Sequence, residues 1–271
     1  MTASIEVARS NVRARPSGFV RDLLTIARRA LRAVPREPEV FAPALFIPAF
    51  FFIVNIGALQ DLTESFPGAE GFSYRNFQLP TAIIFAVTGI SRAPAVVIDI
   101  QTGYFDRLLL SPVRRLPLLL GLMMADFALV IGLCVPVVLL GFALGISFGT
   151  GVLGLLLFVL IGGLWGLAFT GFPYAIALKT ANPGAVASSF ILFFPFAFLT
   201  SSTVPLDNLT GWMRTIARYN PITYVLEGMR SLLSEGWDWA AIGKALLAIG
   251  LLGLVSQTMA LLALRGRLDQ S

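Results

Sequence analysis

Few residues of this chain have side chains that could do chemistry, and several of them gather in one short segment. Only 13% of the 271 residues are charged, yet residues 103–115, GYFDRLLLSPVRR, lie between two long apolar blocks. Pro112 interrupts the segment, and its charged members are Asp106, Arg107, Arg114 and Arg115. These types favour contact with water or with a soluble partner over bond-breaking chemistry.

Enzymatic chemistry has little support elsewhere in the chain. There is no histidine, which excludes Ser-His-Asp and Cys-His catalysis and any histidine-containing metal site. The single cysteine, Cys134, cannot form an internal disulfide. A phosphate-binding loop needs a glycine-rich turn before Lys-Ser or Lys-Thr, whereas Lys179-Thr180 follows no glycine loop and Lys244 is followed by Ala245. The chain therefore lacks that device for binding ATP, and we expect no cofactor or metal in it.

Six long apolar stretches must position the charged segment. A helix that crosses a bilayer needs about 20 mainly apolar residues, and these stretches are apolar all round, unlike the alternating strands of a membrane barrel. They predict an all-α integral membrane protein with six transmembrane helices, at 41–59, 79–98, 117–146, 151–178, 184–204 and 240–264.

The distribution of Lys and Arg predicts the orientation. Basic residues cluster in residues 1–40, between the second and third stretches, at Lys179 and in the tail at 265–271, whereas the first opposite loop is acidic. The positive-inside rule then places both termini in the cytoplasm, around a membrane domain at 41–264. The basic N-terminus follows from the same rule, so we do not expect nucleic acid as a partner.

Residues 17–34 have the pattern of an amphipathic interfacial helix. Apolar residues recur at three- and four-residue spacing, and much of the remainder is basic: Arg21, Arg28, Arg29 and Arg32. Such a helix lies in the membrane interface with its apolar face down. Two compatible interpretations stay open, a topology anchor held by anionic lipid and a lateral strut that also touches a cytoplasmic partner.

The connection 99–115 also allows two interpretations on its pattern alone. It can form a short helix, about 103–110, that ends before Pro112. The helix is either a solvated connector or a rigid knob that transmits force from a soluble partner.

Two motifs in this part of the chain and near the last stretch resemble a known family. The first runs from Asp99 to the pair Ala125-Asp126, and the second is YNPITYVLEGMR at 219–230. Together they resemble the permease subunit of ABC type-2 exporters of the daunorubicin-resistance type, over essentially the whole chain. The residues that carry the first motif are Asp99, Gly103, Arg107, Leu108, Ser111, Pro112, Arg114 and Gly121.

The resemblance implies a permease with a type V-like exporter architecture. It would lie in the plasma membrane of a bacterium, which is the inner membrane of the cell. Two permease copies would form a homodimer around a central path, with two ABC ATP-binding subunits that hold ATP and Mg. A hydrophobic or amphipathic substrate, drug-like or lipid, would leave the cytoplasm or inner leaflet. The coupling helix would comprise Asp99, Gly103, Tyr104, Asp106, Arg107, Leu108, Ser111, Pro112 and Arg114.

The fifth stretch is a candidate wall of the path, and the resemblance implies that the second stretch lines the path with it. The aromatic side chains of the fifth stretch offer contact area without demanding exact hydrogen bonds, and Pro195 can kink the helix. Lipid-facing bulk with ordinary packing is the other interpretation. The candidate path residues are Phe190, Phe193, Phe194, Phe196, Phe198, Thr200 and Ser201.

Two further sites follow from polar residues near membrane depth. Residues 205–230 predict a re-entrant or interfacial hairpin as an outer gate, and its candidate residues are Trp212, Asn220, Pro221, Glu227 and Arg230. Arg92 and Asp126 predict a buried ion pair, because ionisable groups at membrane depth need partners.

The glycines spaced by four at 141–149 and at 162–166 favour close helix packing, within the chain or at a dimer seam.

Other interpretations of the function differ in their cargo or energy source. A lipid-linked glycan is an alternative cargo. An ion-coupled secondary carrier would predict more buried carboxylates and an inverted repeat, and an intramembrane enzyme would need a catalytic cluster.

Overall fold

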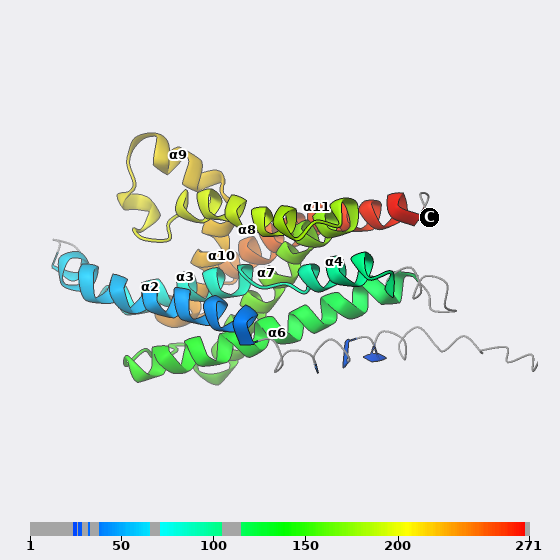
Figure 1. The fold of residues 1–271 in the computed structure, drawn as a ribbon. Coiled ribbons are helices and arrows are strands. Elements are labelled where there is room, and N and C mark those ends of the chain that lie inside the picture. Colours follow the sequence, from blue (N-terminus) through cyan, green and yellow to red (C-terminus); the bar gives the residue numbers. More distant parts are fainter. Residues whose placement is uncertain are drawn as a thin grey trace, which may run out of the picture.

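The computed structural model describes residues 24–25, 27–28, 32, 38–65, 71–104 and 115–268. Every regular element within these ranges is helical (Figure 1). The long helices are α2 (Pro38–Glu64), α6 (Arg115–Ala143), α7 (Gly151–Thr180) and α11 (Trp239–Leu268). The shorter ones are α3 (Tyr74–Thr88), α4 (Ala93–Gln101), α8 (Pro183–Phe198), α9 (Gly211–Tyr219) and α10 (Pro221–Arg230), with a 3-10 turn η2 (Leu206–Asn208) and a π-helical turn η3 (Ser231–Glu235).

The prediction of an all-helical membrane protein is confirmed, with differences in how the chain crosses. Five segments of the described chain are long and apolar enough to span a bilayer: Ala42–Glu64, Tyr74–Gln101, Leu120–Ala143, Gly151–Thr180 and Trp239–Arg267. The stretch expected as the fifth of six spans forms α8, an apolar helix of 16 residues. That length is below the roughly 20 residues that a straight crossing needs.

Two of the predicted helices are shorter than expected. The second stretch, expected as one helix over 79–98, is interrupted at 89–92, so that it forms the two helices α3 and α4. Pro94 then lies in the first turn of α4, a position where proline begins helices readily. The fifth stretch, expected to continue to 204, ends at Phe198, one turn after Pro195.

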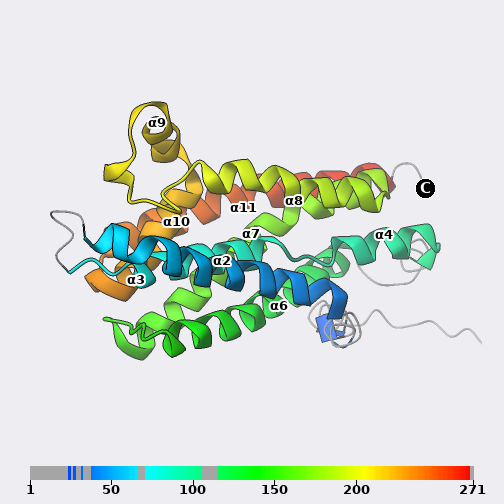
Figure 2. The ribbon, with the colours of Figure 1, turned by 60° about the vertical axis from the view of Figure 1, so that its left-hand side comes forward.

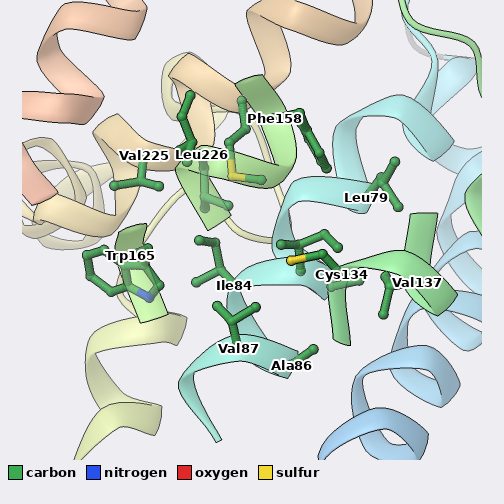
Figure 3. Close-up of a cluster of buried hydrophobic side chains, with 14 of the residues drawn as sticks. Leu79, Ile84, Ala86, Val87, Cys134, Val137, Phe158, Trp165, Val225 and Leu226 are labelled. Carbon is green, nitrogen blue, oxygen red and sulfur yellow. The ribbon is translucent and has the colours of Figure 1, made fainter. Parts of the chain in front are cut away.

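Helix α7 is the centre of the bundle. It contacts α3, α4, α6, α8, α10 and α11. Its fully buried Trp165 and Phe158 pack with apolar side chains of α3, α6 and α10 (Figure 3). The indole of Trp165 donates a hydrogen bond of 2.9 Å to the hydroxyl of Thr88, so the polar end of this large side chain is satisfied inside the core.

The glycines of α7 serve packing within the chain. A Cβ at Gly162 would lie 2.8 Å from Ile83 of α3, and one at Gly166 would lie 2.8 Å from Val130 of α6. Both distances are too short for real contacts, so these positions let neighbouring helices approach. Of the two interpretations of the spaced glycines, the structure uses the pair in α7 for intrachain contacts.

Helices α7 and α11 pack against each other and run in the same direction along the chain. Ser256 and Gln257 of α11 bond the carbonyls of Ala168 and Leu167, and Arg267 bonds that of Leu178. The two helices therefore end together, next to the end of α4, because Gln101 bonds the carbonyl of Ala181 just after α7. We call this the basic end of the bundle, since Lys179, Arg265 and Arg267 lie there.

The opposite end is fixed by loop contacts. The amide of Tyr74 donates to Glu64 at 2.9 Å, and Arg75 joins Gln60 of α2 to the carbonyl of Leu144 after α6. Asp61, Asp207 and Asp238 also lie at this end, which we call the mixed end.

Candidate functional site

A pocket of about 410 Å³ opens between α2, α3 and α8. Most of its wall is apolar and aromatic, and none of the described residues that line it is charged. Its polar groups are concentrated toward the mixed end, at Gln78, Thr81, Ser202 and Thr203, with Asn55 on α2. The apolar part is lined by Pro43, Ala44, Ile47, Pro48, Phe51, Phe52, Ala82, Phe85, Gly89, Phe190, Phe194 and Phe198.

The predicted path residues divide into three groups in the structure. Phe190, Phe194 and Phe198 line the pocket. Phe193 is buried against the core, and Phe196 is 62% exposed and points away from the pocket lining. Thr200 and Ser201 are 2% and 1% exposed and belong to the wall behind the pocket rather than to its surface.

Phe85 of α3 is the aromatic centre of the pocket. Its stretch was expected to line the path, but the sequence does not single out this residue. Its ring centroid lies 5.8, 6.3 and 5.6 Å from those of Phe193, Phe194 and Phe198, in edge-to-face arrangements. Such geometry is the favoured one for aromatic pairs. The two helices are therefore joined through rings that also form the pocket surface.

The non-helical segment 199–204 closes the polar end of the pocket. Backbone at this depth must find partners within the protein, and here side chains of other elements supply them. Gln78 and Thr81 of α3 both donate to the carbonyl of Ser202, each at 3.1 Å. The hydroxyl of Tyr74 donates to the carbonyl of Thr203 at 3.3 Å.

Arg230, at the end of α10, joins three elements at the polar end. Its guanidinium donates to the carbonyl of Ser201 at 2.7 Å, to the hydroxyl of the same residue at 3.0 Å, and to the carbonyl of Phe77 at 3.1 Å. It also lies 3.5 Å above the centroid of the Phe77 ring, a cation–π contact. Only 8% of Arg230 is exposed, so the charge is carried almost entirely inside the protein.

Asn220 connects the predicted outer gate to α8. Its side-chain amide donates to the carbonyls of Phe196 and Leu199, at 2.7 and 3.0 Å, and its oxygen accepts from the amide of Ile222. Asn220 therefore caps the start of α10, where Pro221 occupies the first turn, and at the same time satisfies the end of α8.

The other predicted gate residues lie further from this junction. Trp212 is 68% exposed on α9, a helix whose Ala217 faces the rest of the chain. Glu227 is half-buried on α10, one turn before Arg230. The expected hairpin is therefore two short helices that meet at Asn220, and α9 stands apart from the bundle in both ribbon views (Figures 1 and 2).

The break between α3 and α4 has a carboxylate at its centre. Asp126 of α6 is 1% exposed and accepts a hydrogen bond from the backbone amide of Arg92 at 2.9 Å. It also accepts one from the hydroxyl of Ser91 at 3.3 Å, and that hydroxyl in turn accepts from the amide of Ala93. A negative charge here faces the free amides of a helix N-terminus, its favoured position.

The structure thus brings Arg92 and Asp126 together, while the ion pair predicted for their side chains stays a prediction. The hydrogen bond of 2.9 Å that joins them comes from the main chain of Arg92. The helix break is the reason, because it frees amides that would bond internally in a continuous helix.

Helix α4 leads from this break to the predicted coupling helix. Ala93, Val96, Val97 and Ile100 face α6, α7 and α8 in a second core cluster, and Asp99 is half-buried beside them. Gly103 has a φ of +69°, which turns the chain away from α4, and Tyr104 is 37% exposed.

Part of the prediction falls on segments whose structure is not described. Outside the described residues lie the coupling candidates Asp106, Arg107, Leu108, Ser111, Pro112 and Arg114, and the interfacial-helix residues Arg21 and Arg29. The described Arg28 and Arg32 are helical and exposed. These assignments stay predictions.

Long apolar helices and an uncharged pocket beside two broken helices define this chain as an all-helical integral membrane protein. Residues 21–234 match the family model described as ABC-2 type transporter, and the chain belongs to that family. The resemblance seen in its two motifs is confirmed.

Named relatives agree with this family. The chain is 26% identical over 226 residues to the daunorubicin resistance ABC transporter permease protein DrrB1 of Streptomyces coeruleorubidus, covering 79% of this chain and 77% of the relative. It is 24% identical over 222 residues to the probable doxorubicin resistance ABC transporter permease protein DrrC of Mycobacterium tuberculosis, covering 80% and 79%. A putative transport permease, ycf38 of Cyanophora paradoxa, is 25% identical over 231 residues, covering 80% and 76%.

Proposed function

We propose that this chain is the membrane subunit of an ATP-driven exporter and that the pocket between α2, α3 and α8 receives a hydrophobic or amphipathic molecule without negative charge. The observation that carries the proposal is the pocket itself, about 410 Å³ with aromatic walls and only neutral polar groups. Apolar pockets with a few placed hydrogen-bonding groups are typical of sites for drug-sized ligands.

The lining favours a drug-like or lipid cargo over the lipid-linked glycan. A glycan carried on a phosphate would need a cation at the pocket surface, and the described lining residues supply none. A planar aromatic ligand could instead stack on Phe85 and Phe194 while Gln78 or Thr81 bonds its polar edge. Two relatives are named for resistance to daunorubicin and doxorubicin. Daunorubicin is a suitable probe, because its planar rings can stack on these side chains and the cation of its amino sugar can lie over an aromatic face.

Matched substitutions on one helix test the pocket. Phe194 lines it, whereas Phe196, two residues further along α8, is exposed and does not. We expect Phe194→Ala to raise the half-saturating concentration of daunorubicin about tenfold in reconstituted vesicles with the ATP-binding subunit, because an aromatic contact with the ligand is lost. Phe196→Ala should change it little, and equal effects of the two substitutions would refute the pocket assignment.

The energy would reach this pocket from a separate ATP-binding subunit. We propose that the basic end of the bundle is cytoplasmic, as the positive-inside rule requires, and that the subunit binds the segment 99–114. Movement of that segment would be transmitted along α4, which packs on α7 and begins at the break near Asp126. Two copies of the chain, with two ATP-binding subunits, would place a pocket on each side of a central path.

Co-purification tests this docking. We expect the double variant Arg107→Glu/Arg114→Glu to lose the ATP-binding subunit on affinity purification, because its charges are reversed where the subunit docks. Arg214→Glu is the control, since Arg214 lies on α9 at the mixed end, bonded to the exposed Asp207 at 3.2 Å. Retention of the subunit by the double variant, or its loss in the control, would contradict the docking site.

A further inference from the structure

A second hollow of about 550 Å³ lies at the basic end of the bundle, between α7 and α11 and away from the aromatic pocket. It is a groove along the outer side of two membrane-spanning helices rather than an enclosed cavity. The residues that line it are Ala175, Ile176, Leu178, Lys179, Thr180, Met259, Leu262, Ala263, Gly266 and Arg267.

The deeper part of the groove is apolar and has free space. Met259 and Leu262 are 46% and 58% exposed, on a helix that the bilayer must surround. A Cβ added to Gly266 would meet no atom within 4 Å, so the groove has room beside α11 for an additional chain. In a membrane, hydrocarbon tails are the molecules available to fill it.

The mouth of the groove carries two cations. Lys179 is exposed at the end of α7, and Arg267 is held beside it by a hydrogen bond of 3.3 Å from its guanidinium to the carbonyl of Leu178. The Nε of Arg267 is buried and, within the described residues, makes no hydrogen bond. A buried donor without an acceptor is unfavourable, and an anion lodged at the mouth would provide the acceptor.

We propose that this groove binds one anionic phospholipid, with its phosphate between Lys179 and Arg267 and an acyl chain along Ile176, Met259 and Leu262. Cations near helix ends also offset the helix dipole, but that role needs neither an apolar groove nor a buried donor. A soluble anion would leave the apolar wall uncovered, and a zwitterionic lipid would offset the two charges less well. Basic pockets between spanning helices are known to select anionic headgroups.

Native mass spectrometry of the purified full-length chain tests the proposal. Phosphatidylglycerol and phosphatidylcholine with identical acyl chains are added at equal concentration. We expect the chain to retain phosphatidylglycerol preferentially, and Lys179→Gln/Arg267→Gln to weaken its binding by about tenfold or more. Lys244→Gln/Arg218→Gln removes two exposed cations from the far end of α11 and from α9, and should retain the lipid as the unchanged chain does.

A second variant tests the tail site without removing charge. Gly266→Leu projects a side chain into the free space of the groove, and we expect weaker retention of both lipids while the circular dichroism spectrum stays helical. Equal retention of the two lipids by the unchanged chain, or undiminished phosphatidylglycerol on both groove variants, would overturn the proposal. Because binding is measured by mass, the result is independent of whether the chain exports a drug.

Discussion

The two broken helices of this bundle are stabilised by groups of opposite charge. Where α8 ends, carbonyl groups are left free, and they receive donors from Arg230, Asn220 and Gln78. Where α4 begins, amide groups are left free, and Asp126 accepts from them. The charge of each stabilising side chain is opposite to the partial charge of the helix end that it contacts, which is negative at a C-terminus and positive at an N-terminus. At each break in this chain, the charged group comes from a different helix: Arg230 from α10 and Asp126 from α6.

Removing the cation at the C-terminal break should have the largest effect. Arg230→Met leaves the carbonyls of Ser201 and Phe77 without their donor, and we expect a loss of about 4 kcal/mol in the free energy of unfolding. Reversible unfolding in mixed micelles measures it. Arg230→Lys should recover part of the loss, while Arg214→Met, at an exposed ion pair, should cost under about 1 kcal/mol. Equal costs for the two methionine variants would refute the buried role.

Removing the anion at the N-terminal break comes next. Asp126→Ala strands the amide of Arg92 and the hydroxyl of Ser91, with an expected cost of about 3 kcal/mol. Hydrogen exchange makes the comparison sharper, because amides at 92–96 should exchange faster while those at 199–204 stay protected. Arg230→Met should show the reverse pattern. If each substitution loosened both regions equally, the two breaks would not be separate devices.

Asn220→Ala is expected to have an intermediate effect. It removes two donated hydrogen bonds to α8 and the cap of α10, with an expected cost of about 2 kcal/mol. Asn208→Ala, in the exposed turn η2, is the matched control. A shift in the unfolding midpoint no larger than that of the control would show that the junction between α8 and α10 is held by packing alone.

Ser91→Ala should have the smallest effect. The hydroxyl is an intermediary between Asp126 and the amide of Ala93, and Asp126 keeps its direct bond to Arg92 without it. We therefore expect a cost of about 1 kcal/mol. Combined with Asp126→Ala, the substitution should cost less than it does alone, because the bond between the two side chains is already lost while the bond from the amide of Ala93 remains. Full additivity of the two costs would contradict the bond between the two side chains.

The sequence was sufficient to locate the apolar helices, because long apolar runs in a membrane have few alternative structures. It did not reveal where two of them break. Gly89 and Pro94 flank the first break, but hydropathy averaged over the whole stretch does not detect single residues of this kind. The sequence prediction places Pro94 inside a span, although proline in a first helical turn marks the beginning of a helix. The second break precedes the Thr and Ser residues at 200–203, which an apolar average also tolerates.

The pocket was predictable in part, on the sides formed by α8 and α3. Phe194 and Phe198 were expected in it from their aromatic clustering, whereas Ile47 and Phe51 of α2 carried no signal, since that helix is apolar on every face. Gln78 and Thr81 could have been found, because two amide or hydroxyl side chains three residues apart in an apolar helix need partners. The proximity of Arg92 and Asp126 was foreseen from their charges, but the main-chain donor was not, since it depends on the break.

The parallel pairing of α7 with α11 has a consequence for how the protein is made. Gly171 approaches the backbone at Ser256 so closely that a side chain there would collide with it, and the carbonyls of Leu167 and Ala168 receive their extra donors from α11. In the order of synthesis, α8, α9 and α10 all leave the ribosome before α11 does. During that interval one side of α7 must be shielded by lipid or by the insertion machinery, so maturation of the bundle depends on late events in translation.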